Sequence, residues 1–182
     1  PNERECTHMK MTPKVKKLFN EQINKEYYSA YLYLAMSNWL NENDWPGAAN
    51  WMYVQYKEEI VHAEGFVRYL MMRGEQVDLM PIEMPKKEWN SVLETFEEAL
   101  AHEEFVTDSI DKMAIAAEED GDRAARLFLD WYILEQVEEE VNGNDNVMFW
   151  KKAGDHPGAT LSLDRQYAAR TFEADEIPYL ED

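Results

Sequence analysis

The chain has 182 residues, of which 45% are hydrophobic, so it is expected to form one folded domain of ordinary size or two small ones. Its 37 acidic and 18 basic residues give a formal net charge of −19. That charge argues against nucleic acid or an anionic membrane as the partner, and it suits metal cations. A single cysteine, Cys6, excludes an internal disulfide and any CxxC metal or redox site. No apolar run approaches the roughly 18–20 residues of a membrane span, so a soluble helical protein is expected.

Capping residues, glycines and prolines divide the chain into four long helices and a short one. Thr12 before Pro13 is typical of a helix start, and Asp44 is expected to cap the second helix. Ser91 and Glu94 form a capping-box pattern at the start of the third. The helices are expected over residues 12–41, 44–73, 91–121 and 122–152, with a short fifth over roughly 159–171.

The lengths of the links predict the topology. The first and third links have only a few residues, so each joins an antiparallel pair of helices. The second link, residues 74–90, is long enough to run the whole length of the bundle, which makes the second and third helices parallel. The alternative is two separate hairpins, which would bury less surface. The predicted fold class is all-α: a four-helix up-down bundle with a long crossover and a short fifth C-terminal helix. We expect this domain over residues 12–172, between an N-terminal tail (1–11) and an acidic C-terminal tail (173–182).

Polar residues interrupt the apolar face of each long helix near its middle. Burying several carboxylates together without a cation is too costly. A mid-helix residue also lies at the waist of a bundle whichever way its helix points. The sequence therefore predicts a metal site at the waist, built from Glu26 in the first helix, Glu59 and His62 in the second, Glu103 in the third, and Gln136 and Glu139 in the fourth.

Carboxylate and imidazole ligands without a thiolate favour Fe, Mn or Zn over a soft metal. The i, i+3 spacing of Glu59 and His62 lets both side chains face one ion from the same helix. A lone ExxH pattern arises often by chance, and a glutamate on an apolar stripe is usually a rim residue. Four such clusters at matched depth favour the metal site. His102 has no comparable partner and is expected to be a solvated or rim histidine.

Several segments of this pattern resemble the non-haem ferritins. Residues 20–34 resemble the first helix of that family, and residues 57–64 (KEEIVHAE) resemble the motif of its second helix. Trp89 and residues 101–103 are similar to the third-helix region, and residues 135–137 to the fourth. The resemblance extends over residues 12–170 in one register and is to bacterial-type, ferroxidase-active subunits.

The resemblance implies a two-iron centre and a third, outer iron site. Glu26, Glu59 and His62 would hold one iron, and Glu59 would bridge to a second iron held by Glu103. Gln136 would lie close to the second iron, and Glu139 would be a further ligand. Tyr33 would lie beside the centre, either as an electron donor or as a hydrogen-bonding group. The outer site would use Glu58, Glu135, Glu138 and Glu139. No haem is expected, because Ile60 stands where bacterioferritin has its haem-ligating Met.

The resemblance implies iron storage: Fe(II) is oxidised with O2 and ferric mineral is deposited inside a homo-oligomeric cage, expected to be a 24-mer. The short fifth helix would lie at a contact between subunits. A di-iron oxidase acting on an organic substrate is one alternative, but the fourth helix lacks a second ExxH. A non-catalytic cage subunit is the other, although this chain keeps the centre's ligands. The expected location is the cytoplasm, or a plastid if a transit peptide was removed.

Overall fold

The computed structural model describes residues 10–180, which form five α-helices. The four long helices have 30, 27, 28 and 31 residues. Cys6 and most of the predicted N-terminal tail lie outside this range. Within it, no helix combines the length and the apolarity that crossing a bilayer requires. The helices are α1 (Pro13–Glu42), α2 (Pro46–Met72), α3 (Val92–Glu119), α4 (Arg123–Ala153) and α5 (Pro157–Tyr167).

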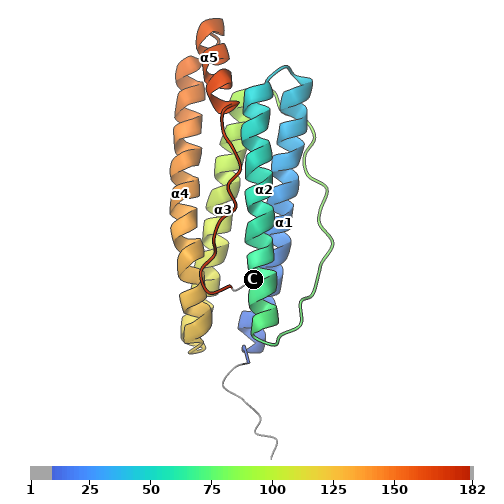
Figure 1. Cartoon of the computed structure of the whole chain (residues 1–182), viewed down its shortest axis with the longest axis vertical. Helices are drawn as coiled ribbons and strands as arrows, with labels where there is room; N and C mark the ends of the chain where they lie inside the picture. The colour runs from blue at the N-terminus through green and yellow to red at the C-terminus, as the bar shows by residue number, and fades with distance from the viewer. Residues whose placement is uncertain (1–9, 181–182) are drawn as a thin grey trace, which may run out of the picture.

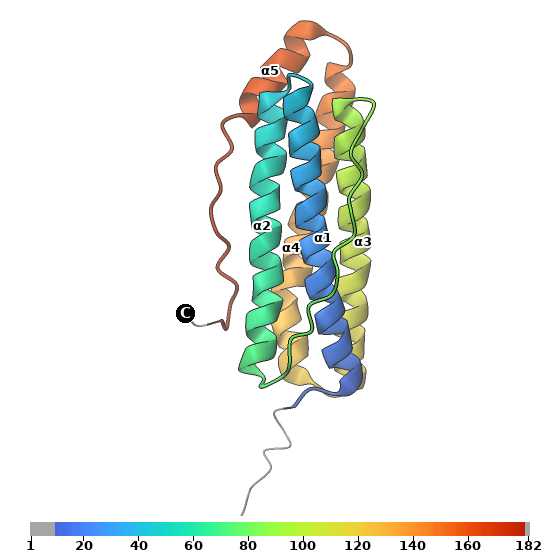
Figure 2. The ribbon, with the colours of Figure 1, turned by 90° about the vertical axis from the view of Figure 1, so that its right-hand side faces the viewer.

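The long helices form one bundle with the predicted topology (Figures 1 and 2). Helices α1 and α2 are an antiparallel pair, and so are α3 and α4. The link between α2 and α3 runs the full length of the bundle, so these two helices are parallel (Figure 2). Asn20 and Asn24 of α1 donate side-chain hydrogen bonds to backbone carbonyls of this link, at Gln76, Met80 and Pro81. The predicted all-α fold class is confirmed.

Two of the three predicted N-caps are confirmed by hydrogen bonds. The side chains of Thr12 and Ser91 accept from the backbone N–H three residues later, and Asp122 caps α4 in the same way. The prediction that Asp44 caps α2 is wrong. Asp44 has φ of 64° and belongs to the turn before the helix, while Trp45 takes the cap position without a side-chain hydrogen bond.

The free N–H groups at the start of α2 are instead bound by α5. The backbone N–H groups of Gly47 and Ala48 donate to the carboxylate of Asp164, at 3.0 and 2.8 Å. A side chain at Gly47 would not fit, because its Cβ would lie 1.7 Å from the Asp164 carbonyl oxygen. The predicted bounds of the fifth helix were also wrong: α5 is capped by His156, starts two residues earlier and ends at Tyr167.

The core consists of two apolar clusters, one toward each end of the bundle. One cluster includes Phe19, Phe66 and Phe128. The other includes Met36, Phe96 and Trp150. Between them lies a layer of buried polar side chains, which contains the predicted ligands. This order along the bundle axis holds the polar layer between two well-packed regions.

After α5 the chain turns back along the bundle. Residues 168–180 run beside α2 toward the opposite end (Figures 1 and 2). We call this stretch the C-terminal strap. Ile177 is buried in the apolar cluster that contains Phe66. The described part of the predicted acidic tail therefore packs on the helices.

The Asp164 contact predicts a measurable loss of stability. Asp164→Ala should lower the free energy of unfolding by about 2 kcal/mol, because two buried N–H groups at a helix N-terminus lose a charged acceptor. Denaturant unfolding of the purified protein measures this difference. Asp155→Ala, which removes an exposed carboxylate from the α4–α5 turn, is the matched control. Equal stability of the two variants would contradict the capping role of Asp164.

Candidate metal centre

The predicted ligands converge on the middle of the bundle. Each of the four clusters lies within about three residues of the midpoint of its helix, as the observed bounds define it. Six of these side chains are buried to 5% exposure or less: Glu26, Glu59, His62, Glu103, Gln136 and Glu139. The predicted waist is therefore present as a layer of buried ionisable groups.

The tightest group joins α1 and α2. One ligand atom each from Glu26, Glu59 and His62 lies within 4.8 Å of the others. His62 Nδ1 is 3.5 Å from Glu59 Oε2. Glu26 Oε2 and Glu59 Oε1 are buried without any hydrogen-bond partner. Buried oxygens without a donor are costly, and a shared cation would satisfy both.

A second group joins α1, α3 and α4 around Glu103. The Tyr33 hydroxyl donates to Glu103 Oε1 at 2.5 Å, and Gln136 Nε2 donates to Glu103 Oε2 at 3.1 Å. Burial raises the pKa of Glu59 most, and the charges of Glu103 and Glu26 raise it further. The Glu59 carboxylate is therefore within electrostatic range of a carboxylate from each group.

Two buried glutamines orient the carboxylates, and neither was predicted from the sequence. Gln22 Nε2 donates to Glu26 Oε1 at 2.8 Å, and Gln55 Nε2 donates to Glu139 Oε2 at 2.6 Å. Gln22 precedes Glu26 by four residues in α1, and Gln55 precedes Glu59 by four residues in α2. Polar residues one turn before a ligand on the same face are therefore the signal that could have revealed them.

Burial makes the ionised forms of the carboxylates unfavourable. It is the largest cause that raises the pKa of Glu26, Glu59, Glu103 and Glu139 above the usual value of a glutamate. Burial alone would lower the pKa of His62. The contacts with Asp175 and Glu59 outweigh it and raise that pKa well above the ordinary value. A raised carboxylate pKa favours the protonated form, so a cation that binds these groups would compete with protons.

The residues predicted for an outer site lie at the edge of this layer. Glu58 is half-buried and forms a 2.7 Å ion pair with Arg170 of the C-terminal strap. Burial raises the pKa of Glu135 to about 7, and neighbouring acidic groups contribute. Glu138 is exposed.

Glu135 also belongs to a second cluster of possible ligands. One ligand atom each from Glu135, His62 and Asp175 lies within 4.8 Å of the other two. Neither Arg170 nor Asp175 was predicted from the sequence.

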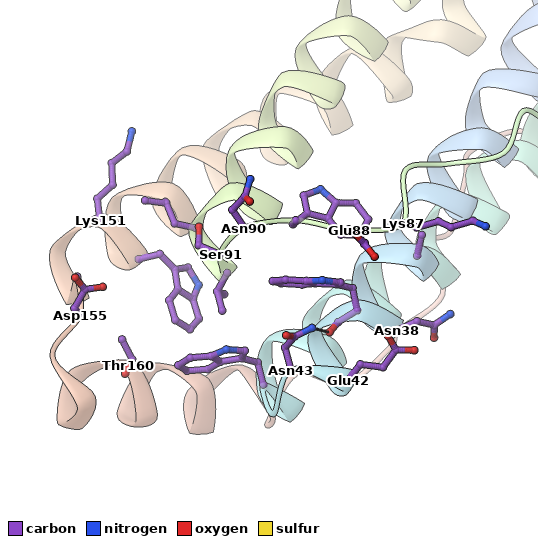
Figure 3. Close-up of a pocket in the computed structure, with 18 residues that line it drawn as sticks. Asn38, Glu42, Asn43, Lys87, Glu88, Asn90, Ser91, Lys151, Asp155 and Thr160 are labelled. Carbon is purple, nitrogen blue, oxygen red and sulfur yellow. Dashed lines mark hydrogen bonds between the residues drawn. The ribbon is translucent and has the colours of Figure 1, made fainter.

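Two further features lie apart from the predicted ligands. His102 is half-buried, with Nε2 2.6 Å from the Ser29 hydroxyl, and burial lowers its pKa. It therefore occupies the rim but is hydrogen-bonded rather than solvated. A cleft of about 1350 Å3 opens at the end of the bundle near α5 (Figure 3), and its lining includes Trp45, Trp89 and Trp150. No predicted metal ligand lines it.

The donor set fits hard or borderline divalent cations such as iron. Four buried carboxylates and one imidazole provide oxygen and nitrogen ligands. Two of the carboxylate oxygens, Glu26 Oε2 and Glu59 Oε1, lack any donor. The Glu26 carboxylate is already oriented by the hydrogen bond from Gln22 to its other oxygen. The arrangement can therefore hold cations deep in the bundle in a largely anionic environment.

Comparison with known proteins identifies the family. Residues 16–145 match the family described as the ferritin-like domain. The bacterial non-heme ferritin of Staphylococcus saprophyticus is 37% identical over 157 residues, which cover 86% of this chain and 94% of that protein. The protein of the same name from Staphylococcus epidermidis is 37% identical over 84% of this chain and 92% of its own.

Solved structures agree with the sequence comparisons. The open pore ferritin of the hyperthermophilic archaeon Archaeoglobus fulgidus superposes with a TM-score of 0.87 and 38% identity. That match covers 88% of this chain and 98% of the archaeal one. A closed form of the same ferritin, engineered by site-directed mutagenesis, gives a TM-score of 0.89 over 90% and 100% of the two chains. With the helical bundle and its buried carboxylate layer, these matches establish that the chain belongs to the ferritin family of iron-storage proteins.

Proposed function

We propose that the protein oxidises Fe(II) to Fe(III) with O2 at a di-iron centre inside each subunit and stores the ferric product as mineral in a cage. The observation that carries this proposal is the Glu26, Glu59 and His62 group, with its two buried, unpaired carboxylate oxygens. Iron is the substrate here. Anionic ligands stabilise Fe(III) over Fe(II), so the site favours transfer of one electron from each iron to O2.

The two groups at the waist suggest how the irons would be shared. Glu26, Glu59 and His62 would bind the first iron. Glu59 and Glu103 would bind the second, with Gln136 close by. Glu139 would be a further ligand of the second iron after release from Gln55, which now donates to it. The connection of Glu59 to both Glu26 and Glu103 supports a bridging position.

Tyr33 is the proposed redox or orienting residue beside the centre. Burial, followed by the neighbouring carboxylates, raises its pKa well above the ordinary value, so the phenol stays protonated. Its hydroxyl donates to Glu103. This hydrogen bond supports an orienting role, and electron donation from Tyr33 during oxygen reduction is the alternative.

A third iron would bind at the outer site of Glu58, Glu135, Glu138 and Glu139. The ion pair between Glu58 and Arg170 bears directly on this site. A cation there would compete with the Arg170 guanidinium for the charge of the Glu58 carboxylate. The third iron should therefore bind more weakly than the two at the waist.

We further propose that the subunits assemble into a closed homo-oligomer of 24 copies. Large apolar side chains are exposed on α4, and three of them, Leu127, Leu134 and Val141, recur every seven residues. Apolar surface of this kind is commonly covered by a partner subunit. The related archaeal ferritin has an open pore form and an engineered closed form. The bacterial relatives favour the cytoplasm as the location over a plastid.

Glu59→Gln tests the proposed centre. The substitution preserves size but removes the bridging charge, so the initial rate of aerobic Fe(II) oxidation should fall by about 100-fold, toward the protein-free rate. Absorbance of Fe(III) follows the reaction. Glu64→Gln, an exposed change on the same helix, should leave the rate unchanged. The proposal is wrong if Glu59→Gln oxidises iron as fast as the unsubstituted protein.

The raised carboxylate pKa values predict that protons compete with metal. Because these groups hold protons at pH values where an ordinary glutamate is ionised, divalent metal must displace protons, and its affinity should fall as the pH decreases from about 7 to about 5. Zinc titrations in buffers of different ionisation enthalpy measure the protons released. Release should be smaller in Glu59→Gln. Binding without proton release would contradict the picture of a proton-neutralised layer.

Particle size tests the cage and separates it from the oxidase alternative. Twenty-four copies of a 21.5 kDa chain should give a particle of roughly 500 kDa by light scattering, with iron-dense interiors after aerobic loading. A small metal-bound oligomer would favour a di-iron oxidase with an organic substrate. A large shell without rapid oxidation would favour a non-catalytic subunit.

A further inference from the structure

The C-terminal strap is fixed to the bundle on both sides of the metal centre. At its start, Arg170 forms the ion pair with Glu58 at 2.7 Å. The same guanidinium donates to Gln55 Oε1 at 3.0 Å and to the Trp51 carbonyl at 3.2 Å. Asn50 of α2 adds a hydrogen bond to the Arg170 carbonyl, at 3.0 Å. These contacts attach the strap to α2 through both its side chains and its backbone.

The second attachment point is Ile177, which occupies space left by a glycine. Gly65 lies in the interior of α2, about two turns before its C-terminal end, where glycine is unfavourable for a helix. A Cβ at this position would lie 2.5 Å from Ile177 Cδ1 and 2.3 Å from the Tyr132 hydroxyl. The Tyr132 hydroxyl in turn donates to the His62 carbonyl, at 2.8 Å. The absence of a side chain at Gly65 therefore allows the strap to pack close to His62.

Between these two attachments, Asp175 reaches the metal centre. Its Oδ2 lies 3.2 Å from His62 Nε2. The other ring nitrogen, Nδ1, faces Glu59 at 3.5 Å. The His62 side chain is 2% exposed, whereas that of Asp175 is 29% exposed. The imidazole thus lies between a buried ligand carboxylate and a carboxylate supplied by the strap.

A neutral imidazole can bind a metal through only one nitrogen while the other carries the proton. If the Nε2–H group donates a hydrogen bond to Asp175, the lone pair of Nδ1 faces Glu26 and Glu59. We propose that Asp175 is a positioning residue of the metal centre, which fixes this tautomer and the ring orientation of His62. The inference rests on the proposed function, because it takes Glu26, Glu59 and His62 as the ligands of the first metal.

The same geometry argues against a separate metal site at His62, Glu135 and Asp175. A cation there would need the Nε2 lone pair while Nδ1 binds the inner metal, and this would require the neutral imidazole to lose its one remaining N–H proton. The hydrogen bond to Asp175 needs no such step.

Removing a carboxylate that hydrogen-bonds a ligating histidine typically lowers the metal affinity by about 10–100-fold.

Cobalt(II) titration without O2 tests the proposal, since Co(II) binds without being oxidised and its visible spectrum reports the ligand geometry. In Asp175→Ala the affinity of the Glu59-dependent site should fall by about 10-fold or more, and its visible bands should change. Asp175→Asn should recover part of the affinity, because its amide oxygen still accepts from Nε2. Asp175→Leu provides a second variant without an acceptor. Glu176→Gln, exposed on the same strap, should match the unsubstituted protein.

Two results would overturn the positioning role. One is an unchanged affinity and spectrum in both Asp175→Ala and Asp175→Leu. The other is loss of one bound Co(II) per chain while the Glu59-dependent site keeps its affinity, because this would make Asp175 a ligand of a second metal. If the unsubstituted protein and Glu59→Gln bind Co(II) alike, the proposed centre itself fails, and that result is distinct from either of the other two.

Discussion

The central constraint on this structure is the burial of four glutamate side chains in the middle of a helical bundle. Glu26, Glu59, Glu103 and Glu139 all lie within this layer and are almost fully buried. Hydrogen bonds from Gln22, Gln55, Tyr33 and Gln136 satisfy only part of their oxygens, and two oxygens have no donor. One histidine cannot neutralise four carboxylates. Protons or cations must supply the rest, and this requirement makes the layer the candidate metal site of this ferritin-family chain.

The surrounding architecture makes such a layer sustainable. Four helices of nearly equal length place their midpoints at one level, and an apolar cluster lies on each side of that level. The aromatic stacking of Phe66 on Tyr132, with centroids 4.0 Å apart, lies directly next to His62. Because both ends of the bundle are well packed, the polar layer can be unfavourable by itself while the whole fold remains stable.

Features that depend on local sequence could be predicted, and those that depend on distant contacts could not. The caps at Thr12 and Ser91 and the convergence of the carboxylates follow from residue spacing along single helices. The crossover follows from the length of the link between α2 and α3. The cap of α2 could not be predicted, because its acceptor, Asp164, is more than a hundred residues away. Asp175 was missed for the same reason: nothing in its own segment indicates that it meets His62.

Crystals soaked anaerobically with Fe(II) test the central claim most directly, through anomalous scattering at the iron edge. The account predicts iron density within bonding distance of Glu26, Glu59 and His62, in the dry centre of each subunit. Iron found only at exposed carboxylates, with the interior of the bundle free of density, would contradict it.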